Sequence, residues 1–166
     1  MSIRLFDTHT HFDVPDFDED REQLAYAAKS RGVEHLILIG FLESRFHDLL
    51  KTHYFLNGLE LSPQSHFAPG LHPFYIEDHQ VQHLDSLAQL LKMENCVAIG
   101  EIGLDTFLKQ HKAPEICQKQ KDFFTTQIDL AQQYDKPILL HIRKSHADVL
   151  AILKYQHFKN GGIAHA

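Results

Sequence analysis

The chain has 166 residues, of which 43% are hydrophobic and 23% charged, a composition that suits one domain with a buried core and excludes a disordered chain. The formal net charge of −6 argues against a broad basic surface for nucleic acid. No apolar run approaches the roughly 18 residues of a membrane span, so we predict a soluble, cytoplasmic protein without membrane contact.

Short apolar runs separated by helical patterns predict a strict alternation of strands and helices. Residues 3–8 are expected to form the first strand, followed by a helix that Asp18 or Asp20 caps and that ends at Gly32. The later elements follow in chain order: strand 34–40, helix 42–56, strand 66–71, helix 80–92, strand 96–101, a helix from Pro114 that ends before Pro137, strand 137–141, a helix begun by a capping box of Ser145 and Asp148, and strand 161–165.

The strands read as continuous apolar runs, which is typical of a parallel sheet covered on both faces. An open doubly wound sheet and a closed (β/α)8 barrel both fit this pattern. Ligand-type residues at the ends of several strands favour the TIM-type barrel, where the strand ends surround one axis. A complete barrel takes about 250 residues. We therefore expect residues 1–166 to be a single barrel domain containing about the first six β-α units, with the C-terminal part lying beyond Ala166.

Cysteines and most histidines are not expected to form a site. Cys96 and Cys117 form no CxxC pair, and Cys96 lies in an apolar run that predicts a core position. Six of the fourteen histidines are interpreted as surface residues: His47, His53, His79, His83, His111 and His157.

The first strand leads into two histidines with an HxH spacing. Because side chains at i and i+2 share one face of a strand about 6.6 Å apart, His9 and His11 can bind one metal ion from the same side. Asp7 has the same parity and is expected to orient one of the imidazoles. Two solvated polar residues at a strand end would give the same pattern.

Glu101 follows a strand of core type and is flanked by Gly100 and Gly103. A partly buried carboxylate needs a cation or hydrogen bonds, and its two oxygens can bridge two cations. The glycines allow groups to approach closely. Asp105 is interpreted as an acid that structures the loop or orients a ligand, rather than as a ligand itself.

The later strands contribute further candidates. His141 is expected to bind a second metal ion, and Arg143, which has the same parity, to hold a phosphate or carboxylate, although a salt bridge to a barrel acid fits as well. His165 ends the sixth run and completes the ligand set. His72, after the third strand, is a candidate for substrate contact or for a structural turn. Together these residues suit two divalent ions, which in such sites lie about 3.5–4 Å apart and promote in-line displacement at phosphorus.

Several motifs resemble the TatD family of metal-dependent deoxyribonucleases, in the amidohydrolase-like barrel superfamily. The motifs are Asp7-Thr8-His9-Thr10-His11-Phe12-Asp13, Gly70-Leu71-His72-Pro73, Ala98-Ile99-Gly100-Glu101-Ile102-Gly103-Leu104-Asp105, Leu140-His141-Ile142-Arg143 and Gly162-Ile163-Ala164-His165. The resemblance implies that His9 and His11 bind the first ion, that Glu101 bridges, and that His141 and His165 bind the second. The family's further metal-binding aspartate, in a Thr-Asp-x-Pro type motif, has no counterpart in these 166 residues.

The first hypothesis is therefore a nuclease that uses two divalent ions to activate water against the phosphodiester bonds of DNA or an oligonucleotide. Glu101 and Arg143 would act in catalysis, and Arg143 and His72 would hold the substrate. Zn²⁺, Mn²⁺ and Mg²⁺ all remain candidates. A hydrolase of an amide, lactone or aminoacyl ester on the same barrel is the second hypothesis, and an inactive incomplete barrel is the third. The sequence assigns no oligomeric state, and a monomer fits it.

Overall fold

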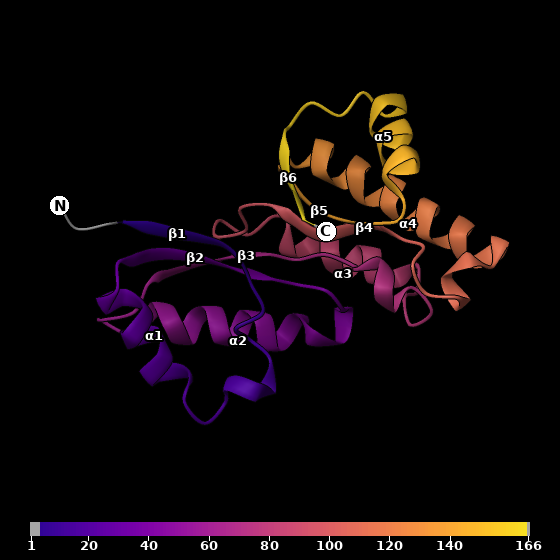
Figure 1. The fold of residues 1–166 in the computed structure, drawn as a ribbon. Coiled ribbons are helices and arrows are strands. Elements are labelled where there is room, and N and C mark those ends of the chain that lie inside the picture. Colours follow the sequence, from indigo (N-terminus) through magenta and orange to yellow (C-terminus); the bar gives the residue numbers. More distant parts are fainter. Residues whose placement is uncertain (1–3, 166) are drawn as a thin grey trace.

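The computed structural model describes residues 4–165, and the side chains of residues 4–164. Strands and helices alternate without exception, as predicted (Figure 1). In chain order they are β1 (Leu5–Thr10), α1 (Arg21–Ser30), β2 (Val33–Ile39), α2 (Phe46–Asn57), β3 (Gln64–Ala68), α3 (Gln82–Leu90), β4 (Ile99–Asp105), α4 (Pro114–Gln133), β5 (Ile138–Arg143), α5 (His146–Tyr155) and β6 (Gly162–His165).

All strand pairs are parallel. Strands β1, β2 and β3 form one three-stranded sheet and β4, β5 and β6 a second, each in sequence order. Backbone hydrogen bonds also connect β3 and its flanking residues to β4 and its flanking residues. Val97 N donates to Phe67 O at 3.0 Å, and Gly100 N donates to Pro69 O at 2.9 Å. The six strands therefore follow one another side by side in chain order, as the first strands of a barrel do.

The two faces of the strands have different cores. On β2, Leu36 and Leu38 belong to the large cluster that includes buried residues of all five helices. Ile37 and Ile39 lie between them in sequence and join a smaller cluster with Ala68, Ala98 and Leu139, to which no helix contributes. This alternation follows from the opposite directions of successive side chains in a strand. The smaller cluster lies on the face of the strands that is not covered by helices.

Strand β4 lies further along the chain than predicted, at Ile99–Asp105 instead of 96–101. Glu101 is consequently the third residue of this strand and not its last. The apolar run was a poor guide because every residue of β4 is buried, including the acids Glu101 and Asp105. Polarity therefore did not mark the end of the strand. The site residues of β4 and β5 lie on paired strands, with Gly103 opposite His141.

The predicted capping box of α5 is wrong in its contacts although the helix begins in the predicted place. Ser145 occupies the N-cap position, but its hydroxyl donates a hydrogen bond of 2.7 Å to Leu104 O and makes no cap bond. Ser145 thus ties the end of β5 to β4. Pro114 does occupy the first turn of α4, as expected.

Three of the six histidines expected on the surface are buried: His53, His79 and His111 are at most 2% exposed. Histidine can be buried in a neutral, hydrogen-bonded form more easily than a residue that is always charged. A histidine in a polar stretch can therefore lie either on the surface or in the core. Cys96 is buried in the core, as predicted. None of the helices in the described part of the chain combines the length and apolarity that a membrane span requires.

Candidate metal centre

The carboxylate of Glu101 lies at the centre of a group of histidines from different strands. Its Oε2 is 3.3 Å from His9 Nε2 and 3.6 Å from His72 Nε2, and its Oε1 is 3.2 Å from His141 Nδ1. Glu101 is 3% exposed. Burial by itself raises the pKa of this carboxyl, but hydrogen bonds to His141 and His9 outweigh burial and lower the pKa well below its ordinary value. Glu101 therefore carries a negative charge inside the site.

Two sets of ligand atoms share this carboxylate. Atoms of His9, His11 and Glu101 lie within 4.8 Å of one another, and so do atoms of His72, Glu101 and His141. Each set combines imidazole nitrogen with carboxylate oxygen, the donors that Zn²⁺ and Mn²⁺ accept. The described residues therefore include two candidate ligand sets for divalent metal, with Glu101 common to both.

His11 is oriented by the backbone of the neighbouring strand. Its Nδ1 donates a hydrogen bond of 3.1 Å to Ile39 O, the last residue of β2. This bond fixes the tautomer, because the other ring nitrogen, Nε2, then carries a lone pair. Asp7, predicted to orient an imidazole, accepts a hydrogen bond of 3.1 Å at Oδ1 from the backbone N–H of His9.

His141 lies between two carboxylates. Its Nδ1 faces Glu101, and its Nε2 is 3.1 Å from Oδ2 of Asp105, which is fully buried. Burial lowers the pKa of His141, but the hydrogen bonds to Glu101 and Asp105 outweigh it and raise the pKa above its ordinary value. With Nε2 engaged by Asp105, Nδ1 is the nitrogen directed at the shared site. Asp105 also accepts a hydrogen bond of 2.9 Å from Phe107 N, so its carboxylate contacts both the His141 ring and the loop after β4. An orienting role for Asp105 stays a prediction.

Replacing Asp105 with asparagine is expected to weaken divalent-metal binding by about 10- to 100-fold, because it removes the charge that holds the His141 ring. In the metal-free protein the same change should lower the pKa of His141, which NMR titration would measure. Asp129→Asn, at an exposed site on α4, is the matched control. Unchanged metal affinity in a chelator competition would contradict this role.

His72 is placed as a hydrogen-bond donor. Its Nδ1 accepts a hydrogen bond of 3.0 Å from the N–H of Phe74, so in the neutral ring the proton is on Nε2, which faces Glu101. Burial, followed by the proximity of His141, lowers the pKa of His72 to about 3, so the ring is neutral at ordinary pH. A nitrogen that carries a proton cannot bind a metal ion. Of the two roles predicted for His72, the structural turn role is observed, since its Nδ1 caps the short 3-10 helix Pro73–Tyr75. Substrate contact through Nε2 stays a prediction.

Two glutamines of α4 fix the backbone at the site, and sequence reasoning missed both. Gln120 accepts from Asp105 N at 2.8 Å and donates to Asp105 O at 2.9 Å. Gln127 makes the same pair of bonds to Leu71, the residue before His72, at 2.8 and 3.2 Å. Both side chains are 1% exposed. Their spacing of seven on the apolar face of the helix was the signal, since buried amides require partners.

Arg143 lies at the end of β5 with its guanidinium carbon 3.7 Å from the centre of the Phe107 ring. The alternative of a salt bridge to a barrel acid is not observed among the described residues. Stacking on Phe107 holds the guanidinium of Arg143 at the C-terminal end of β5 and leaves its positive charge unneutralised. His165 pairs with His141 in the backbone register of β5 and β6, but its side chain lies outside the described residues, so its ligand role stays a prediction.

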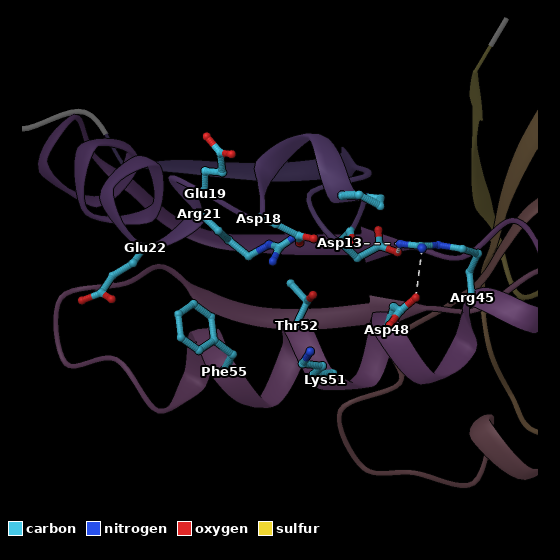
Figure 2. A pocket seen from close by; sticks show the side chains of 11 residues that line it. Asp13, Asp18, Glu19, Arg21, Glu22, Arg45, Asp48, Lys51, Thr52 and Phe55 are labelled. Carbon is cyan, nitrogen blue, oxygen red and sulfur yellow. Dashed lines mark hydrogen bonds and ion pairs between the residues drawn. The ribbon is translucent and has the colours of Figure 1, made fainter.

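A polar cavity of about 370 Å³ lies between α1 and α2 and shares no lining residue with the metal-ligand sets (Figure 2). Two of its arginines hold the segment that follows His11. Arg21 donates to Phe12 O and Val14 O, and Arg45 donates to Asp13 O, all at 2.9 Å. The cavity wall therefore positions the end of the HxH motif and is not itself part of the candidate site.

Arg21→Ala is expected to lower the free energy of unfolding by about 2 kcal/mol, because two charge-assisted hydrogen bonds to the backbone are lost. The control Arg31→Ala removes an exposed arginine one residue after α1 and should change the free energy of unfolding little. Urea denaturation of both variants measures the difference, and equal stabilities would contradict the positioning role.

The chain is similar to known metal-dependent hydrolases. A family model described as "TatD related DNase" matches residues 6–166. The chain belongs to the TatD family. An uncharacterised metal-dependent hydrolase of Haemophilus influenzae is 33% identical over 168 residues, and the match covers 98% of this chain and 62% of that protein. A protein of Dickeya dadantii named 3′-5′ ssDNA/RNA exonuclease TatD is 31% identical, and the match covers 90% of this chain and 53% of the relative.

The structural comparison agrees with the sequence comparison. The crystal structure of YjjV, a TatD homologue from Escherichia coli, superposes with a TM-score of 0.83 at 31% identity, covering all of this chain and 61% of that one. The predicted TIM-type architecture is therefore confirmed for six successive parallel strands. The chain spans about three fifths of the length of YjjV.

Proposed function

We propose that this TatD-family chain hydrolyses phosphodiester bonds of DNA or of a similar oligonucleotide with two divalent metal ions. The observation that carries the proposal is the shared position of Glu101, whose two oxygens face histidines on opposite sides. Bound there, the ions would supply an activated water and stabilise charge on the phosphoryl oxygens. The name of the Dickeya dadantii relative supports nucleic acid as the substrate class.

The protein's own residues have separate roles in this proposal. His9, His11, Glu101 and His141 hold the ions, and His165 is proposed to complete the set. His72 presents its Nε2–H to the site and can donate a hydrogen bond to a phosphoryl oxygen. Arg143, stacked on Phe107 and without a carboxylate partner among the described residues, can pair with a second phosphate oxygen.

The full chain is expected to release nucleotides from a 5′-labelled single-stranded oligonucleotide with Mn²⁺ or Mg²⁺, and to lose this activity in EDTA. A parallel panel of amide, lactone and aminoacyl ester substrates separates the proposal from the other hydrolase hypothesis. Hydrolysis of the panel without any oligonucleotide cleavage would refute the proposal. Elemental analysis of the purified protein would identify the metal it retains.

A further inference from the structure

An aromatic pocket adjoins the metal centre on the side of β2 and β3. The cavity has a volume of about 380 Å³ and is lined by His11, Val14, Phe41, His72, Phe74 and Tyr75. His11 and His72 also belong to the two ligand sets around Glu101. The pocket is therefore continuous with the metal centre, and the three aromatic residues form its outer wall. Phe41 follows β2, and Phe74 and Tyr75 lie in the short 3-10 helix Pro73–Tyr75 that follows β3.

The rings of this wall form a connected series. The centroid distances are 5.3 Å from His11 to Phe41, 5.5 Å from Phe41 to Tyr75 and 5.1 Å from Tyr75 to Phe74. The interplanar angles are 82°, 33° and 74°, so none of these pairs is stacked face to face. These rings line the cavity without stacking face to face on one another.

The aromatic wall does not serve the folded core. Phe41, Phe74 and Tyr75 belong to neither buried cluster and are not packed against one, and Phe74 is 43% exposed. Apart from one another, these rings contact histidines, Phe74 against His111 at 6.0 Å and Tyr75 against His72 at 6.2 Å. Exposing an aromatic ring to water is unfavourable, so an exposed ring at the site is a candidate ligand contact. No lysine or arginine lines the pocket. Attraction of a phosphate backbone is thus not what this pocket provides.

We propose that this pocket binds a nucleobase next to the phosphodiester that lies at the metal centre, by stacking on Phe41 and Tyr75. Base stacking on aromatic side chains tolerates every base and does not depend on a basic surface. It also requires an unpaired base, so the pocket selects single strands or frayed ends over duplex. The inference rests on the proposed function, because that function places the phosphate beside His11 and His72.

Binding and turnover test the inference separately. Binding is measured by fluorescence anisotropy in EDTA, where no cleavage occurs, with a labelled thymidine trinucleotide and with the same trinucleotide lacking its central base. Turnover is measured with Mn²⁺ on thymidine 5′-(p-nitrophenyl phosphate) and on methyl p-nitrophenyl phosphate, which has no base. We expect the base to improve affinity and kcat/KM by about 10-fold or more.

Two variants and a control assign the preference to the pocket. Tyr75→Leu and Phe41→Leu should each reduce the preference for the base about 10-fold while leaving turnover of the methyl ester close to normal. Tyr155→Leu makes the same change on α5, where Tyr155 is 82% exposed, and should alter nothing.

The outcomes distinguish the inference from the proposed function. Equal turnover of the two esters, together with equal affinity for the two trinucleotides, overturns the pocket assignment and leaves the phosphodiesterase proposal standing. A base preference in binding that Tyr75→Leu abolishes, without cleavage of either ester, supports the pocket and refutes the proposed reaction. A base preference that survives both substitutions also overturns the inference.

Discussion

Glu101→Gln is expected to lower the rate of oligonucleotide cleavage by at least about 1,000-fold. The substitution keeps the size of the side chain but removes the negative charge shared by the two ligand sets. The proposed ions would then bind less tightly, and the several kcal/mol of charge stabilisation that they would supply would be lost. The variant should retain less metal after purification. Measuring cleavage with Mn²⁺ and metal content by elemental analysis tests both expectations.

The fold of the Glu101→Gln variant must be checked because a buried carboxylate is being changed. Losing the charge should not expose the core, so the far-UV circular dichroism spectrum is expected to stay unchanged. Glu60→Gln, at an exposed position before β3, is the matched control and should cleave at the normal rate. Cleavage by Glu101→Gln within a few-fold of that of the unmodified protein would remove the basis of the proposed function.

Gly103→Ala is expected to lower the free energy of unfolding by about 2–4 kcal/mol and to reduce metal binding. Gly103 has a φ of +144°, and a Cβ atom there would collide with the carbonyl O of His141, its partner on β5. Relief of that collision requires β4 and β5 to separate at the point where Glu101 and His141 meet. Urea denaturation and chelator competition measure the two effects.

Gly161→Ala is the matched control for Gly103→Ala. Gly161 also has a positive φ, +75°, but a Cβ atom there would have no neighbour within 4 Å. Its substitution should therefore cost only the backbone strain, about 1–2 kcal/mol, and leave metal affinity unchanged. If the two variants were equally stable and bound metal equally well, contact between Gly103 and His141 would not be what positions the site.

Local sequence patterns predicted the alternation of strands and helices because apolar spacing and backbone preference are properties of each segment by itself. Pro114 and Gly32 mark the start of α4 and the end of α1 through their own backbone preferences, which no distant residue alters. The limits of β4 were misplaced because the barrel interior buries acids as well as apolar residues. Ser145 failed as a cap because a distant acceptor, Leu104 O, was available to its hydroxyl.

The sequence by itself determined which residues carry donor atoms and that parallel strands bring them to one region, since spacing and polarity are local properties. Only the tertiary structure decided which nitrogen of each histidine faces the site. Ile39 O sets the tautomer of His11, Phe74 N that of His72, and Asp105 the orientation of His141. Ile39 and Asp105 lie on other strands than the histidines they contact, and Phe74 N meets His72 only because the chain turns after β3. The direction of each hydrogen bond therefore depends on three-dimensional geometry.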